Sequence, residues 1–221
     1  MKITFLWQSS FLIQTKQKTI GIDIWLENPI HPLTISDIPT LDYACCTHDH
    51  FDHGFQTMME FARRDDVLFL SGYEMMNHAK EKWCQTGHAN VWWLFSVDDD
   101  LEFALTPALH SSNTGQPVWL LFVIEGKTIY HMGDTAYMSE FSMIRDVYAP
   151  DIVMIPIGGR YTMGIPEAAY ALDVLQPRIA IPMHYDTFPG IAQDPHLLQK
   201  KMNTDTTHVQ IMKPWQSYES V

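Results

Sequence analysis

One short segment, Thr47-His48-Asp49-His50-Phe51-Asp52-His53, holds three imidazoles and two carboxylates. It includes the end of the apolar run 43–47, which has the composition of a buried strand, and it precedes residues 54–64, whose apolar side chains recur at helical spacing. Imidazole nitrogens and carboxylate oxygens are ligands that borderline divalent metals accept, whereas neutral histidines crowded together without a metal gain little. A loop between a strand and a helix also lets such side chains converge. The segment therefore predicts a metal site, in preference to a solvated charged turn.

Strand and helix patterns continue on both sides of this segment. Residues 2–6, 10–15 and 19–23 are alternating or β-branched runs that predict an antiparallel meander of three strands. Further strands are predicted at residues 67–70, 91–95, 101–106, 118–125, 128–131, 151–155, 178–182 and 208–212. Helices are predicted at residues 54–64, 73–85, 138–147, 166–175 and 195–202. Two strand-rich parts of the chain, each with its own helices, indicate two sheets packed together with helices outside.

The composition is typical of a soluble globular protein. The 221 residues are 46% hydrophobic and 18% charged, which suffices for one full core, so we expect a single domain spanning residues 1–221. The formal net charge of −12 repels polyanions, so we expect a small-molecule substrate and no nucleic-acid partner. No stretch approaches the roughly 18 uninterrupted apolar residues of a membrane span, so no membrane partner is expected. Homo-oligomerisation is left open.

The cysteines form no cross-linking pattern. Cys45 and Cys46 are adjacent and Cys84 is distant, which fits neither a disulfide framework nor a Cys-x-x-Cys zinc clamp. Neighbouring strand residues point to opposite faces, so we expect Cys45 and Cys46 to pack on the two faces of one strand. The apolar start of the chain is interrupted by polar residues 8–10 and is not expected to be a cleaved signal peptide. We expect a reducing, cytoplasmic location.

The histidine-rich segment has a family likeness. The spacing of His48, His50, Asp52 and His53 after a strand resembles the His-x-His-x-Asp-His hallmark of the metallo-β-lactamase superfamily. Downstream matches to the remaining ligand positions of that superfamily are His110, Asp134 and His184. Stretches 5–6, 9–13, 128–131, 156–159 and 162–164 also resemble a branch of metal-dependent hydrolases related to ascorbate-6-phosphate lactonase. The resemblance implies an α+β fold, the four-layer αββα sandwich, with metals at the edge where the two sheets meet.

The resemblance also implies a dinuclear site with seven ligands. It assigns one ion to His48, His50 and His110 and the other to Asp52, His53 and His184, with Asp134 bridging both ions. Two divalent ions about 3.5–4 Å apart can share a water and lower its pKa from about 15.7 towards about 7. The resulting metal-bound hydroxide would be the nucleophile, and Asp52 would orient the water or accept its proton. Zinc is the first expectation, with manganese, iron and nickel open, because imidazole and carboxylate suit them all.

The implied function is hydrolysis of a small ester, lactone or phosphoester. Two alternatives remain at this point. One is an iron-loaded redox protein on the same fold, which would usually require a partner flavin or a different ligand pattern. The other is a metal-binding module without turnover, which a complete ligand set disfavours.

The chain departs from the resembling branch near the expected site. Trp7 and Gln8 stand where the branch usually has Gly-His, so a titratable imidazole is missing there. Other departures replace frequent glycines or asparagines of the branch, and they are Asp49, Phe51, Arg160 and Asp186. We therefore expect a substrate preference that differs from that of relatives, on an intact set of metal ligands.

Substrate contacts are expected from Arg160, Tyr161 and Tyr185. The first two follow a pair of glycines on a loop after a strand, and an arginine fork can hold a carboxylate or phosphate at two points. Tyr185 directly follows His184. His131 is either a partner of the site or a satisfied core histidine. The remaining histidines are expected at the surface or at caps, and they are His31, His78, His88, His196 and His208.

Overall fold

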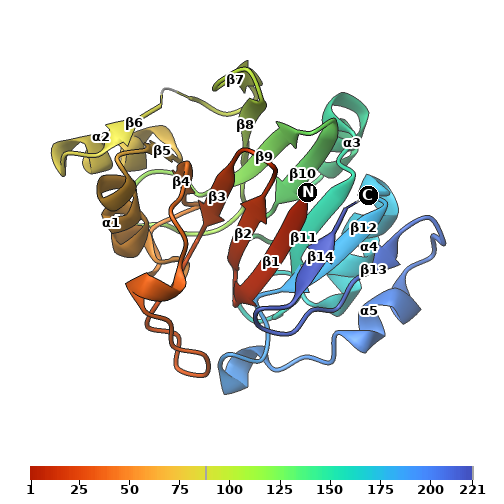
Figure 1. Ribbon diagram of the computed structural model, residues 1–221. Coiled ribbons are helices and arrows are strands. Elements are labelled where there is room, and N and C mark those ends of the chain that lie inside the picture. The colour runs from red at the N-terminus through yellow and green to blue at the C-terminus, as the bar shows by residue number, and fades with distance from the viewer. Residues whose placement is uncertain (88, 221) are drawn as a thin grey trace.

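The computed structural model describes residues 1–87 and 89–220, and their strands form two sheets of seven strands each (Figure 1). The first sheet contains, in spatial order, β14 (Ser217–Glu219), β1 (Lys2–Trp7), β2 (Ser10–Gln14), β3 (Thr19–Ile22), β4 (Tyr43–Cys45), β5 (Leu68–Leu70) and β6 (Gln85–Thr86). The second sheet contains β13 (His208–Val209), β12 (Ile179–Met183), β11 (Ile152–Pro156), β10 (Lys127–His131), β9 (Val118–Ile124), β8 (Leu101–Pro107) and β7 (Phe95–Ser96).

Helices cover the outer face of each sheet. The first sheet is covered by α1 (Phe55–Asp65) and α2 (Tyr73–Glu81), whose buried residues share one apolar cluster with the outer faces of its strands. The second sheet is covered in the same way by α3 (Phe141–Tyr148), α4 (Ile165–Leu175) and α5 (His196–Lys201). Short 3-10 helices are η1 (Ile35–Asp37), η2 (Phe51–His53) and η3 (Pro189–Ile191). The predicted four-layer αββα sandwich is confirmed.

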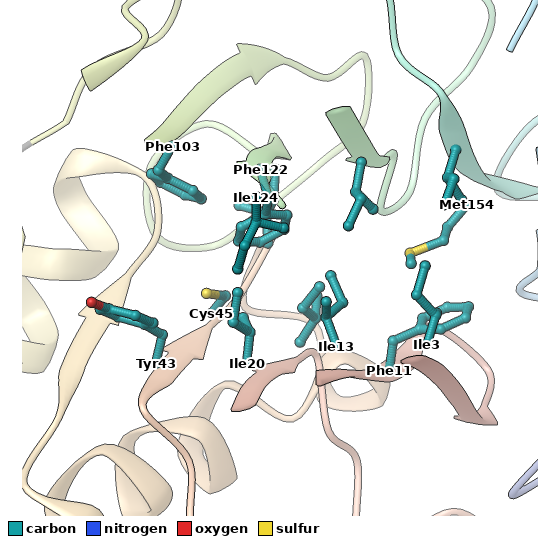
Figure 2. Close-up of a cluster of buried hydrophobic side chains, with 14 of the residues drawn as sticks. Ile3, Phe11, Ile13, Ile20, Tyr43, Cys45, Phe103, Phe122, Ile124 and Met154 are labelled. Atoms are coloured by element: carbon teal, nitrogen blue, oxygen red, sulfur yellow. The ribbon is translucent and has the colours of Figure 1, made fainter. Parts of the chain in front are cut away.

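The main core lies between the two sheets and follows from the two-residue period of the strands. In β1, Ile3 and Phe5 point into the layer between the sheets, whereas Leu6 points towards the helices. Figure 2 shows this layer, with Ile13 from the first sheet facing the strands that carry Phe122 and Met154. Each sheet is therefore apolar on both faces, which requires a helix layer on each outer side.

The cysteines follow the same alternation. Cys45 lies in the layer between the sheets and Cys46 lies in the layer beneath α1, as predicted for neighbouring strand residues. Both are free and buried, as is Cys84. None of the helices in the described part of the chain is long and apolar enough to cross a membrane.

The strand directions bring five exit loops to one edge of the sandwich. Strands β3 to β6 run parallel to one another, and so do β10 to β13. Strand β8 is antiparallel to β9, which is antiparallel to β10, so β8 and β10 share a direction. The carboxyl ends of β8, β10, β11 and β12 therefore open on one edge of the second sheet. The exit loop of β4 meets them, because Val118 N donates to Thr47 O across the two sheets.

Several predicted boundaries were wrong. The helix predicted at 73–85 ends at Glu81, because Trp83 adopts a φ of 67°, and Gln85–Thr86 form β6 instead. In the strand predicted at 91–95, Val91 makes an isolated bridge and Trp92 has a φ of 70°, so only Phe95–Ser96 pair as β7. The last predicted strand shortens to His208–Val209, and β14, which pairs with β1, was not predicted. His88 lies outside the described residues.

Candidate metal centre

The seven predicted ligands come from four exit loops that meet at this edge. The loop after β4 and the adjoining η2 carry His48, His50, Asp52 and His53, and the loops after β8, β10 and β12 carry His110, Asp134 and His184. Two left-handed backbone positions turn the chain sharply into the site, namely Gly133 with a φ of 48° and His184 with a φ of 55°. A Cβ at position 133 would meet Thr47 at 2.9 Å, so this turn requires glycine.

Asp134 lies at the centre of the cluster. Its Oδ2 lies 3.5 Å from His110 Nε2 and 4.0 Å from His48 Nε2. The same oxygen lies 3.0 Å from His184 Nε2, and Oδ1 lies 3.2 Å from His53 Nε2. One carboxylate is thus within reach of imidazoles on both sides of it.

The ligand atoms separate into two groups, each of which could hold a metal ion. The donor atoms within each group lie within 4.8 Å of one another. The groups are His48, His50, His110 and Asp134, and Asp52, His53 and His184. Within the first group, His50 Nδ1 lies 3.1 Å from His48 Nε2 and 3.3 Å from His110 Nε2. Within the second group, His184 Nε2 lies 3.4 Å from Asp52 Oδ2. The structure brings all seven predicted ligands together.

The chemistry of the donor atoms fits divalent cations. Four buried atoms of this cluster have no hydrogen-bond partner among the described residues: His53 Nε2, Asp134 Oδ1, His184 Nδ1 and His184 Nε2. His53 Nε2 lies 3.2 Å from Asp134 Oδ1, and His184 Nε2 lies 3.0 Å from Asp134 Oδ2, but neither pair has the geometry of a hydrogen bond. Buried polar atoms without partners are costly, and nearly all such groups in native proteins are satisfied. Cations bound beside Asp134 would satisfy His53 Nε2, Asp134 Oδ1 and His184 Nε2. His184 Nδ1, on the other side of its imidazole ring, lies beside Gly158.

The pKa shifts within the cluster also fit bound cations. Burial alone would lower the pKa of His184, but the carboxylates of Asp134 and Asp52 raise it to about 9. Burial would raise the pKa of Asp134, but His184 and His53 hold it well below its usual range. Without a cation, protons on imidazoles thus balance the buried carboxylates. Metal ions would replace those protons, because ligating imidazoles are neutral.

Asp23 is a residue of the candidate site that the sequence analysis missed. It is completely buried at the end of β3, and its Oδ2 lies 2.7 Å from His53 Nδ1. Asp23 also accepts hydrogen bonds from the Thr47 backbone N–H at 2.8 Å and from Thr47 Oγ1 at 2.6 Å. A carboxylate beside Nδ1 would keep a proton on that atom, so that Nε2 could offer its lone pair to a metal. The sequence feature that could have indicated this residue is an aspartate placed directly after an apolar strand.

Gln8 occupies the position where the resembling branch usually has a histidine. Its Nε2 donates to Asp52 Oδ2 at 2.8 Å, and its Oε1 accepts from Thr187 Oγ1 at 2.5 Å. Its backbone carbonyl accepts from the His184 N–H at 2.9 Å. Gln8 therefore ties two ligands of the second group to the β1–β2 turn, Asp52 through its side-chain amide and His184 through its backbone carbonyl. The sequence had indicated only the missing imidazole.

His131 is a satisfied core histidine that supports the site indirectly. Its Nε2 lies 2.9 Å from the Ser9 carbonyl, and its Nδ1 accepts from the Gly133 N–H at 3.2 Å. Nε2 therefore carries the proton, and the ring holds the turn that precedes Asp134. The other histidines expected at the surface are at least partly exposed where the structure describes them, and these are His31, His78, His196 and His208.

A cavity of about 610 Å³ opens above the cluster. Its lining combines metal-ligand candidates with aromatic and cationic side chains, and includes Arg160, Tyr161, Phe51 and Phe188. Arg160 and Tyr161 thus lie where substrate contacts were predicted. Tyr185 does not, because it is 5% exposed and packs against Trp7 at a ring distance of 5.7 Å, away from the cavity lining.

Known proteins resemble this chain over nearly its whole length. Residues 2–184 match the family model described as Beta-lactamase superfamily domain. The UPF0173 metal-dependent hydrolase of Staphylothermus marinus is 42% identical over 205 residues, covering 91% of this chain and 89% of the relative. That of Korarchaeum cryptofilum is 36% identical over 222 residues and covers 99% of each chain. A metallo hydrolase of known structure from Ignicoccus hospitalis is 35% identical, with a TM-score of 0.92, and the match covers 100% of this chain and 99% of that one.

Proposed function

Because this chain belongs to the metallo-β-lactamase superfamily and, within it, to the UPF0173 metal-dependent hydrolases, we propose that it cleaves a small ester, lactone or phosphoester at a dinuclear metal site. The observation that carries the dinuclear proposal is the position of Asp134. Its two oxygens lie between His110 on one side and His53 and His184 on the other, at 3.0 to 3.5 Å. A single carboxylate in that position is suited to bridge two ions.

The proposed ligand sets follow the two groups of donor atoms. His48, His50 and His110 would hold one ion and Asp52, His53 and His184 the other, with Asp134 shared. Burial and the neighbouring His53 lower the pKa of His48, which keeps this imidazole in the neutral, ligating form. Zinc is the first choice for an imidazole and carboxylate site, with manganese, iron and nickel as alternatives.

Bound divalent ions would supply Lewis acidity and lower the pKa of a shared water towards about 7. The chain's own contribution begins with Asp52. Its Oδ2 is held by Gln8, and no hydrogen bond from the described residues reaches Oδ1. Burial would raise the pKa of Asp52, but the neighbouring His184 and His53 imidazoles lower it. Asp52 is therefore an anion with one free oxygen, which can orient the attacking water or accept its proton.

Arg160 and Tyr161 are the proposed substrate contacts. Both line the cavity, and the Arg160 guanidinium lies over the Tyr161 ring at 5.4 Å. The structure records no ion pair for Arg160 with any residue it describes, although the chain has a net charge of −12. An unpaired guanidinium at the mouth of a metal site suits the recognition of a carboxylate or phosphate group.

The wider setting is proposed from charge and cysteine chemistry. The acidic balance favours a small-molecule substrate over a nucleic acid. Three free, buried cysteines suit a reducing cytoplasm.

A substrate panel tests the proposed activity. Purified protein, loaded in turn with zinc and manganese, is assayed on esters, lactones and phosphodiesters with and without a chelator. We expect chelator-sensitive turnover of at least one class, abolished in Asp134→Ala. Spectra and metal analysis of the same preparations address the iron-loaded redox alternative, and family membership favours a hydrolase over it. Metal-loaded protein without turnover on any class would instead favour a binding module.

A further inference from the structure

We propose that an aromatic wall beside the metal centre, formed by Trp25, Phe51 and Phe188, selects substrates that carry an aromatic or similarly flat apolar group. This inference rests on the proposed function, because it takes the cavity above the ligands to be the substrate site. The inference adds a chemical feature to the proposed substrate: a ring next to its anionic or scissile end.

Phe51 is the most exposed part of this wall. It lies in η2 between two proposed ligands, His50 and Asp52, and it lines the cavity while being 70% exposed. Single exposed apolar residues are common on protein surfaces and need no function. Phe51 differs because its ring is held in a defined arrangement at the mouth of a chemically active cavity, together with a second phenylalanine. Exposed apolar surface of that kind is typical of a ligand site.

Trp25 supports both phenylalanine rings from behind. It is 5% exposed and does not line the cavity. Its ring meets Phe51 edge-on at 5.5 Å with an interplanar angle of 82°, and it lies 6.1 Å from the Phe188 ring. The Trp25 backbone N–H donates to Ser10 Oγ at 3.1 Å, which anchors this residue to β2. Three segments far apart in sequence thus build one pre-formed surface, and a pre-formed surface costs little ordering on binding.

Arg160 places a positive charge next to the wall. A Cβ built at Gly190, two residues after Phe188, would lie 3.4 Å from Arg160 Nη1. The guanidinium therefore borders the same turn that carries the Phe188 ring. A ligand with an anionic group near Arg160 and the metal ligands can lay a ring against Phe51 and Phe188. An aryl phosphoester has both features, whereas a small aliphatic substrate would leave the wall uncovered.

Two inert ligands that differ only in the ring test this proposal. Phenylphosphonate and methylphosphonate share the anionic group and are not hydrolysed, so calorimetric titration of the metal-loaded protein reads binding alone. We expect phenylphosphonate to bind about tenfold tighter than methylphosphonate, the size of a well-packed aromatic contact. In Phe51→Ala this ratio should fall to about two or three, while methylphosphonate affinity stays nearly unchanged. Tyr73→Ala, which removes another exposed ring on α2, should keep the full ratio.

Metal content is measured in each variant, because Phe51 stands between two ligands. If Phe51→Ala loses metal, Phe188→Ala carries the same prediction, since Phe188 is farther along the chain from the ligands. Equal affinity for the two phosphonates in the unmodified protein would overturn the proposal. So would an unchanged ratio in a variant that keeps its metal. Absence of turnover on every substrate of the panel would count against the proposed hydrolysis without altering this binding result.

Discussion

The side-chain amide of Gln8 donates a hydrogen bond of 2.8 Å to Oδ2 of Asp52, and both groups are buried. The orientation of the amide is fixed, because Thr187 Oγ1 donates to Gln8 Oε1 at 2.5 Å and leaves Nε2 facing the carboxylate. A side-chain amide does not titrate, so Gln8 holds Asp52 in place by a hydrogen bond but cannot transfer a proton to it. This chain thus has a positioning contact where the resembling branch usually has an imidazole.

The first prediction concerns this contact. Gln8→Glu should weaken metal binding more than Gln8→Ala does, because a second carboxylate would face Asp52, whereas alanine only removes a donor. We expect a loss of about tenfold in metal affinity for Gln8→Ala and more for Gln8→Glu, the range seen for groups that orient metal ligands. Competition with a chromophoric chelator measures both values. Gln17→Ala, at an exposed position, is the control, and an unchanged affinity in Gln8→Glu would contradict the assignment.

The second prediction concerns Asp23. Asp23→Asn keeps the shape of the side chain but removes the negative charge of Oδ2, which lies 2.7 Å from His53 Nδ1. We expect metal affinity to fall between about 10-fold and 100-fold, as for other carboxylates behind a ligating histidine. The same chelator competition measures it. Asp205→Asn at the surface should bind metal normally, and equal losses in the two variants would show that ligand orientation is not the cause.

The third prediction concerns metal content. Elemental analysis should find close to two transition-metal ions per chain, since seven converging ligands exceed what one tetrahedral ion uses. Asp134→Ala should impair metal retention and abolish turnover while the far-ultraviolet circular dichroism spectrum stays the same. His78→Ala, whose ring packs on Phe55 away from the site, should do neither. A reproducible content of one ion in the unmodified protein, or equal metal loss in both variants, would count against the dinuclear site.

The metal ligands could be predicted from the sequence because histidine and aspartate side chains are themselves the usual ligands of divalent metals. His48, His50, Asp52 and His53 cluster within one loop, and a buried strand before them fixes where that loop lies. The layers were also predictable, since the strand and helix periods divide the apolar residues between faces.

The supporting contacts could not be predicted, because they join positions far apart in the chain. Asp23 and His53 are 30 residues apart, and Gln8 and Asp52 are 44 apart, so only the strand pairing brings them together. Tyr185 was misplaced for the opposite reason. It neighbours His184 in sequence, but the positive φ of His184 turns the chain, and the tyrosine ring packs into the core. Very short strands such as β6 and β14 carry too few residues to show a period.

The fourth prediction concerns pH and a contact far from the metal centre. Burial would raise the pKa of Asp98, but hydrogen bonds from Lys18 and Tyr43 lower it from 3.8 to about 2. A lowered pKa contributes stability that is present above about pH 3.8 and is lost as the pH falls through about 2. Asp98→Ala should therefore cost about 1 kcal/mol at neutral pH, since the group is partly exposed, and progressively less between pH 4 and pH 2. Urea unfolding of the metal-free protein measures this difference, with Asp99→Ala as the exposed control. A cost that does not change with pH would rule out the ionic contribution.

The fifth prediction concerns Arg160 and an anionic substrate. The guanidinium lies over the Tyr161 ring at the cavity rim. A positive charge at the rim should attract an anionic group of the substrate equally in the ground state and in the transition state. Uniform binding of that kind changes KM and leaves kcat nearly unchanged. We therefore expect Arg160→Ala to raise KM about tenfold for the best anionic substrate of the panel. Arg178→Ala, on the opposite edge of the second sheet, should leave both constants unchanged. Metal content is measured in parallel, so that ligand loss is not mistaken for weak binding. An unchanged KM would remove Arg160 from the substrate site and leave Tyr161 as the next residue to test.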